Sequence, residues 1–254
     1  MSTISGISTQ TNNYYSKLAS GKAIQSASDG AAELAIIQGQ TSQINGYNAA
    51  KDSMETGKAA LNIADSALGS LTENLHKMKE LAIQASNGIL TDSDKQSIQD
   101  EIEQIKQNIS SISSNTEFNT KKLLDGSNKE MQIPTDGNGH FTSISTGTTT
   151  LDALGLADFD VTKDFDLQDI DDALSIVSKT RGNIGAQSNS LDYAINYNAT
   201  AIENLTRAKS TLEDLDMPKA ISEQKKEEAL QLYQIMMQKK QMEQQMNSVS
   251  ILFK

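Results

Sequence analysis

The stretch that decides the fold is residues 47–85, which read YNAAKDSMETGKAALNIADSALGSLTENLHKMKELAIQA. Apolar or small side chains recur in it every seven residues, with companions three positions further on. The first row is Tyr47, Met54, Leu61, Leu68, Leu75 and Ala82, and the second is Ala50, Gly57, Ala64, Leu71, Met78 and Ala85. Such a repeat is typical of a helix that packs one apolar stripe along a bundle. The stretch therefore predicts one long bundle helix.

Two further runs repeat this pattern downstream. After the acidic turn signal TDSD at residues 91–94, isoleucines recur at spacings of four and three residues: Ile98, Ile102, Ile105, Ile109 and Ile112. A third run keeps a seven-residue repeat: Ile170, Val177, Ile184, Leu191, Asn198, Leu205 and Leu212. We predict that the rod core contains Leu61, Leu68, Leu75, Ile98, Ile102, Ile105, Ile109, Ile184, Leu191 and Leu205. A helix rises about 1.5 Å per residue, so helices with runs as long as these are expected to form long rods.

The composition of the 254-residue chain excludes several other classes of protein. Aromatic residues make up 4% of it, cysteine and tryptophan are absent, and proline occurs twice. Large β-sandwiches, barrels and disulfide scaffolds are therefore not expected. The net charge of −11 repels phosphate backbones and anionic lipid, so neither nucleic acid nor a membrane is an expected partner. The beginning of the chain, MSTISGISTQ, has no basic or apolar region typical of a cleaved signal peptide.

The segment between the second and third runs, residues 126–165, has a different composition. Glycines and a proline punctuate it, and Met131–Ile133 and Phe141–Ser145 flank a turn-rich stretch, which predicts one small β-hairpin. The tail after Pro218 is helix-prone, with Leu230, Tyr233 and Met237 on one face. The predicted fold class is all-α: a long antiparallel helical rod, or coiled-coil-like bundle, with one small β-hairpin and terminal helices.

Several ordered segments resemble one protein family. They are LASGKAIQSASDGAAE at 18–33, LHKMKELAIQAS at 75–86, FNTKKLLDG at 118–126 followed by MQI at 131–133, LGLADFDV at 154–161, IDDALSIVSKTRGNIGAQSNSLDYAI at 170–195 and LEDLDMPKAI at 212–221. Together they cover nearly the whole chain and resemble the bacterial flagellins, the subunits of flagellar filaments. The chain is identified as a short, rod-only and atypical or minor member of that family.

The resemblance implies a domain arrangement and a set of partners. Residues 1–30 would form an N-terminal inner-layer segment and linker, residues 31–215 a rod domain that includes the hairpin and linker region 126–165, and residues 216–254 a C-terminal inner-layer helix. The chain would be a structural subunit that polymerises with itself outside the cell for motility. Its export through the flagellar export apparatus would not use a cleaved signal peptide. The further implied partners are a flagellar export chaperone, a cap protein and, for shed monomer, Toll-like receptor 5.

Two groups of surface residues follow from the same resemblance. A protofilament- or receptor-facing surface would contain Lys77, Lys79, Glu80, Leu81 and Glu101. From the residues alone, this group reads as a charged solvated face with Leu81 in the bundle. A terminal assembly group would contain Leu230, Met237, Ile251, Leu252 and Phe253.

The sequence predicts no catalytic residues, no metal site and no cofactor. His76 and His140 are isolated from one another, and the chain has no cysteine to complete a zinc site. The acidic stretch at 158–172 lacks the glycine and terminal glutamate of a calcium loop, and is read as a solvated linker and helix start. We therefore expect no enzyme activity. Two alternative functions remain open from sequence: a hook-filament junction protein, or a non-flagellar coiled-coil signalling or adhesin rod.

Overall fold

The computed structural model describes residues 14–128 and 130–252, with side chains up to residue 246. The chain divides into two compact units. Unit 1 lies within Met1–Gln43 and Glu203–Lys254, and unit 2 is Ile44–Ile202. The domain boundaries expected near residues 31 and 215 coincide with breaks between helices, whereas the compact units divide about a dozen residues further inside.

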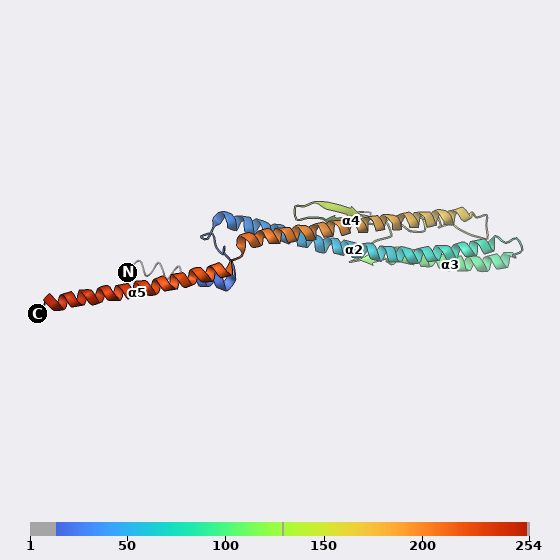
Figure 1. The fold of residues 1–254 in the computed structure, drawn as a ribbon. Coiled ribbons are helices and arrows are strands. Elements are labelled where there is room, and N and C mark those ends of the chain that lie inside the picture. Colours follow the sequence, from blue (N-terminus) through green and yellow to red (C-terminus); the bar gives the residue numbers. More distant parts are fainter. Residues whose placement is uncertain (1–13, 129, 253–254) are drawn as a thin grey trace. The chain divides into compact units, whose positions relative to one another are not determined.

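The structure is predominantly α-helical, which confirms the predicted fold class (Figure 1). The helices are α2 (Ala31–Ala85), α3 (Asp92–Asn115), α4 (Leu167–Glu213) and α5 (Met217–Leu252), and residues 14–20 are also helical. The acidic turn signal begins α3, because Thr91 and Asp94 form a reciprocal capping box there. Helices α2, α3 and α4 lie side by side in unit 2, where their apolar stripes share one core.

The core of unit 2 follows the three apolar runs closely. Both rows of α2 are buried from Met54 to Ala85, and four isoleucines of α3 are buried against them. The contribution from α4 is Ile170, Ala173, Val177, Ile184 and Leu191. Further along α4 the run is less enclosed: Asn198 is buried, whereas Leu205, in unit 1, is only half-buried.

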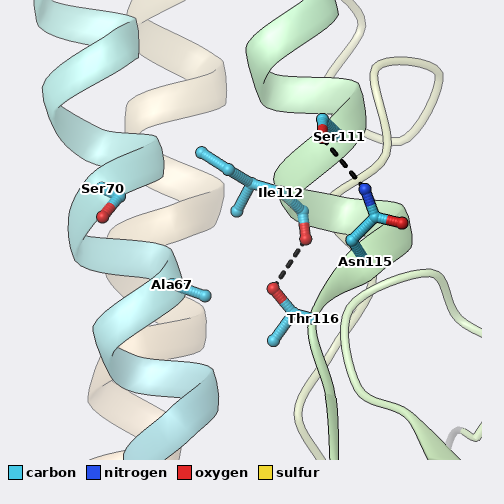
Figure 2. Close-up of a pocket in the computed structure, with 6 residues that line it drawn as sticks. All are labelled: Ala67, Ser70, Ser111, Ile112, Asn115 and Thr116. Atoms are coloured by element: carbon cyan, nitrogen blue, oxygen red, sulfur yellow. Dashed lines mark hydrogen bonds between the residues drawn. The ribbon is translucent and has the colours of Figure 1, made fainter.

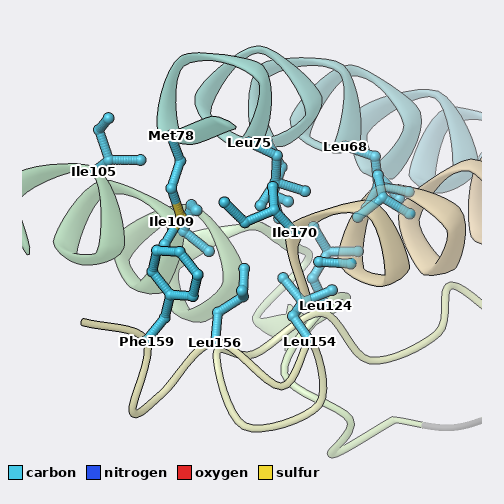
Figure 3. Packing of buried hydrophobic residues seen from close by; sticks show 14 of the residues in the cluster. Leu68, Leu75, Met78, Ile105, Ile109, Leu124, Leu154, Leu156, Phe159 and Ile170 are labelled. Atoms are coloured by element: carbon cyan, nitrogen blue, oxygen red, sulfur yellow. The ribbon is translucent and has the colours of Figure 1, made fainter. Parts of the chain in front are cut away.

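The non-helical segment contributes residues to this core. Leu154, Leu156 and Phe159 point from the loop into the space beneath α2 and α3 (Figure 3). Two polar contacts tie the loop to α3: the Val161 N–H donates to Gln99 Oε1 at 2.8 Å, and Lys106 Nζ donates to the Phe159 carbonyl at 3.3 Å. A stretch that the sequence marks only as a linker is therefore part of the hydrophobic core.

The predicted hairpin is present as β3 (Met131–Pro134) paired antiparallel with β4 (Phe141–Ile144). Gly46 and Gly137 touch through their backbones, since a Cβ on Gly46 would lie 2.6 Å from Gly137 Cα. Asn198 Nδ2 of α4 donates to the Thr135 carbonyl at 2.9 Å. The hairpin is thus attached to two helices of unit 2.

A second strand pair was not predicted from the sequence. Strands β1 (Glu117–Phe118) and β2 (Lys121–Lys122) pair across a two-residue turn. Asn119 and Thr120 both have positive φ, 47° and 66°, as a tight hairpin turn requires. Asparagine tolerates this conformation, but threonine is an uncommon choice, so the pattern lacks the usual Asn-Gly signal.

We expect Ile109→Asp to unfold unit 2 at a lower temperature than the parent. Ile109 is fully buried, and an unpaired carboxylate there should cost roughly 3 kcal/mol or more. The melting temperature, followed by circular dichroism, should fall by on the order of 10 °C. The control is Asn108→Asp, which adds the same charge at the neighbouring exposed position of α3. Equal melting temperatures for the two variants would contradict the core assignment.

Candidate assembly surface

The described part of the chain offers no grouping of side chains for metal chemistry. Within residues 14–128 and 130–252, His, Asp and Glu side chains do not gather in groups of three that could hold a metal ion. His76 is exposed, and His140 Nδ1 contacts Asp136 Oδ2 within the turn of the β3–β4 hairpin. Among the described helices, none combines the length and apolar character needed to cross a membrane.

Two surface hollows of unit 2 are lined by small polar and apolar residues. The larger, about 320 Å³, lies between α2 and the end of α3 (Figure 2). Its lining is Ala67, Ser70, Ser111, Ile112, Asn115 and Thr116. Two of its polar groups already bond within the lining: Thr116 Oγ1 donates to the Ile112 carbonyl at 2.6 Å, and Asn115 Nδ2 donates to Ser111 Oγ at 3.0 Å. The second hollow, about 250 Å³, also has no titratable side chain in its lining. Neither has the groups needed for acid–base catalysis.

The structure separates the residues expected at a protofilament or receptor surface, which are Lys77, Lys79, Glu80, Leu81 and Glu101. Leu81 is buried in the unit 2 core and is not available to a partner. Lys79 bonds Asp171 of α4, whereas the exposed Lys77 and Glu80 pair with each other at 3.4 Å. Glu101 on α3 is exposed. An open surface is left at Lys77, Glu80 and Glu101.

Exposed apolar side chains concentrate on α5. Of eighteen large apolar side chains that are exposed in the described structure, ten lie on this helix. They are Met217, Ile221, Leu230, Leu232, Tyr233, Ile235, Met236, Met237, Met242 and Met246. Monomeric soluble proteins rarely expose contiguous apolar surface of this kind, and such patches mark interaction sites. Helix α5 is therefore the candidate assembly surface.

The apolar side chains of α5 form two rows on opposite sides of the helix. At 100° per residue, Leu230, Tyr233 and Met237 align on one side, as expected from the sequence; we call this the Leu230 row. The other side carries a longer row, the Ile235 row, which the sequence reading missed. Its members are Met217, Ile221, Leu232, Ile235, Met242 and Met246. Lys225, Glu228 and Lys239 occupy the positions between them and hide the repeat.

The predicted terminal residues do not all fall in the described structure. Leu230 and Met237 are exposed on α5. Ile251 and Leu252 belong to the helical backbone of α5, but their side chains lie outside the described ones, and Phe253 lies outside the described residues altogether.

Within unit 1, a short backbone bridge fixes the beginning of α5. We call residues 21–23 and 213–215 the terminal clasp. The Ala23 N–H donates to the Glu213 carbonyl at 2.7 Å, and the Leu215 N–H donates to the Gly21 carbonyl at 2.9 Å. Gly21 has a φ of 69°, a conformation that glycine adopts without steric cost. The clasp joins the segment before α2 to the break between α4 and α5.

Charged side chains reinforce the terminal clasp. Lys22 Nζ lies 2.6 Å from Glu213 Oε1, and Lys209 Nζ lies 3.4 Å from Glu213 Oε2. The hydrogen bond from Lys22 holds the pKa of Glu213 below its ordinary value. In the adjoining loop, Lys17 lies 2.9 Å from Asp29 and lowers the pKa of that carboxyl group in the same way.

The helix that carries both rows also contacts the N-terminal helix of unit 1. Tyr15 Oη donates to Glu228 Oε1 at 2.8 Å, which places residues 14–20 against the N-terminal part of the Ile235 row. A helical bundle with a shared apolar core, together with a helix that exposes two apolar rows, is typical of proteins that assemble through helix packing.

Comparisons with known proteins identify the family within that class. Residues 1–129 match the model of the bacterial flagellin N-terminal helical region, and residues 167–250 match that of the C-terminal helical region. The chain belongs to the bacterial flagellin family. A flagellin of Halalkalibacterium halodurans is 35% identical over 214 residues, covering 82% of this chain and 79% of that protein.

Two other proteins show the same relationship. The flagellar filament 33 kDa core protein of Treponema phagedenis is 30% identical over 235 residues, covering 84% of this chain and 82% of the relative. The crystal structure of Bacillus cereus flagellin matches with a TM-score of 0.52 and 27% identity, over 58% of this chain and 88% of that one. Neither alternative function, the junction protein or the signalling or adhesin rod, is favoured by these findings.

We expect the terminal clasp to open in acid. Because the folded-state pKa of Glu213 lies below its ordinary value of 4.5, the clasp gains stability above about pH 4.5 and loses it as the pH falls through the folded pKa. The protection factors of the amides of Ala23 and Leu215, which compare each exchange rate with the intrinsic rate at the same pH, should fall over that range. Glu213→Gln should make their exchange fast already at neutral pH.

The control for this prediction is Glu203→Gln, which removes a carboxylate on the same helix that pairs with Arg207 in an exposed position. Exposed pairs of this type contribute little. If both variants exchange at the parental rate, the ion pair does not hold the clasp closed.

Proposed function

We propose that this chain is a structural subunit of the bacterial flagellar filament, which polymerises with copies of itself for motility and performs no catalysis. The observation that carries the proposal is the concentration of exposed apolar side chains on α5. Membership of the flagellin family supports it, as does the name of the Treponema relative, a flagellar filament core protein.

The physical basis of assembly is the burial of the two α5 rows between subunits. Unit 2 already covers its own apolar seams, so it has little left to gain from a partner. Helix α5, in contrast, exposes most of its large apolar side chains, and each would contribute about 25 cal/mol per Å² of area buried. Contacts with neighbouring copies would then stabilise the terminal helices, because a partner that binds the ordered state of a segment favours that state.

The arrangement within the filament is part of the proposal. Residues 1–30 and 216–254 would form the inner layer, and residues 31–215 the rod around it. The helix breaks on either side of the terminal clasp support these boundaries, because α2 begins at Ala31 and α4 ends at Glu213. The hairpin and linker region 126–165 would stay with the rod, since its apolar residues belong to the unit 2 core.

Location and further partners rest on the family alone. We place the subunit outside the cell, exported through the flagellar export apparatus with an export chaperone and assembled beneath a cap protein. Toll-like receptor 5 is the proposed partner of shed monomer. Its contact surface would be limited to Lys77, Glu80 and Glu101, because Leu81 is buried and Lys79 is paired with Asp171.

Ile235→Asp should abolish filament formation without unfolding the subunit. Ile235 is exposed in the free chain, so a charge there costs little folding energy, but it would be buried unpaired in an assembled Ile235 row. Electron microscopy and sedimentation should find filaments for the parent and soluble subunit for the variant. The control is Gln238→Asp, which places the same charge on α5 between the two rows. Filaments from Ile235→Asp would contradict the role of this row.

A chain that ends at Gln224 should keep the thermal transition of unit 2 and fail to polymerise. The truncation removes the whole Leu230 row and most of the Ile235 row, while leaving every residue of the unit 2 core in place. Circular dichroism would follow the melting transition, and electron microscopy the assembly. A lowered melting temperature would indicate that α5 packs within its own subunit instead.

A further inference from the structure

Nine methionines occur in the sequence, and Met1 lies outside the described residues. The other eight are divided between the unit 2 core and α5. Met54 and Met78 are fully buried in unit 2, and Met131 packs against the same core. Five are exposed on α5: Met217, Met236, Met237, Met242 and Met246. The fractional exposure of Met242 and Met246 reaches 61% and 69%.

This distribution decides where an oxidant would react. The chain has no cysteine and no tryptophan, so it lacks the thiol and indole groups that would compete for a mild oxidant. Thioether sulfur is then the most readily oxidised group available, and its reactivity depends on access. The thioethers of α5 are open to solvent, whereas those of the bundle helix α2 are enclosed.

We propose that α5 carries a methionine-oxidation site, formed by Met236, Met242 and Met246, at which a peroxide-class oxidant converts the free subunit into a form that does not assemble. The sulfur lone pair attacks one peroxide oxygen, the O–O bond breaks as the S–O bond forms, and the departing hydroxide takes up the remaining proton as water. Sulfur loses two electrons and the peroxide gains them. The effect on assembly rests on the proposed function, but the site of modification does not.

The position of these residues explains why the product would matter. Met242 and Met246 belong to the Ile235 row, and Met236 lies beside it. Oxidation replaces a flexible apolar side chain with a polar one that carries a strong hydrogen-bond acceptor. Burying that acceptor without a donor opposes association. The unit 2 core contains none of these residues, so its fold should be unaffected.

The modification should also depend on the state of the protein. In the free subunit the three sulfur atoms are accessible, but an assembled Ile235 row would enclose Met242 and Met246. Subunit that is already polymerised should therefore be protected. Since methionine sulfoxide is reducible by the two classes of methionine sulfoxide reductase, the block should be reversible.

The test treats the full-length chain with dilute hydrogen peroxide and maps sulfoxide by peptide mass spectrometry. Sulfoxide should appear on α5 before it appears at Met54 or Met78, while the thermal transition of unit 2 stays unchanged. The treated subunit should need a concentration roughly tenfold higher, or more, to polymerise. Reductase treatment should restore the original value.

Three variants make the test specific. The chain with Met236→Leu, Met237→Leu, Met242→Leu and Met246→Leu should assemble normally and resist peroxide, because leucine keeps the volume and apolar character. The matched control, Met131→Leu, should assemble and stay sensitive. Met242→Gln, a polar residue of similar length, should weaken assembly without any oxidant.

Each result has one consequence. Sulfoxide at Met54 or Met78 as early as on α5 would overturn the site. Complete oxidation of α5 with unchanged polymerisation, or equal sensitivity of the leucine variant, would overturn its effect on assembly. Failure of the untreated parent to polymerise would overturn the proposed function and the assembly effect together, while the sulfoxide map would still decide the site.

Discussion

The rest of unit 2 depends on the need to cover the apolar stripe of α2 from Met54 to Ala85. A single helix cannot bury such a stripe, and α3 and α4 each supply one matching row. The loop that carries Leu156 and Phe159 fills the space that three helices leave open (Figure 3). Gln99 and Lys106 of α3 bond the Val161 N–H and the Phe159 carbonyl of this loop, so these two backbone groups keep a partner next to the core.

The polar residue in the third run has a related explanation. Asn198 interrupts an otherwise apolar repeat, and it is buried at the position where the hairpin meets α4. Its amide group donates to the Thr135 carbonyl, while Asn198 Oδ1 has no hydrogen-bond partner in the structure. A leucine could pack there but could not bond the hairpin backbone. Asparagine therefore packs less well here than leucine would, but it attaches the β3–β4 hairpin to α4.

The sequence predicts those parts of the fold whose residues follow a regular spacing or a recognisable turn composition. Seven-residue spacing identified the stripes of α2, α3 and α4, and turn composition identified the β3–β4 hairpin. It did not reveal the β1–β2 turn, whose threonine is an unusual residue for positive φ, or the insertion of Phe159 into the core, since single apolar residues in a loop have no period. The Ile235 row was missed because charged residues take three of its positions. The ion pair of Lys79 with Asp171 joins residues that are far apart in sequence. The spacing of residues along one helix cannot predict such a pair.

The terminal clasp also affects how unit 1 responds to a pulling force. Helices α4 and α5 are separated by only three residues, so a pull along α5 is passed on through that short connection and through the two backbone hydrogen bonds at Ala23 and Leu215. Helical turns on either side are held by continuous hydrogen-bond ladders, whereas this point has few bonds acting together. Under load along α5, unit 1 would yield first at the clasp, before the helices on either side of it unwind.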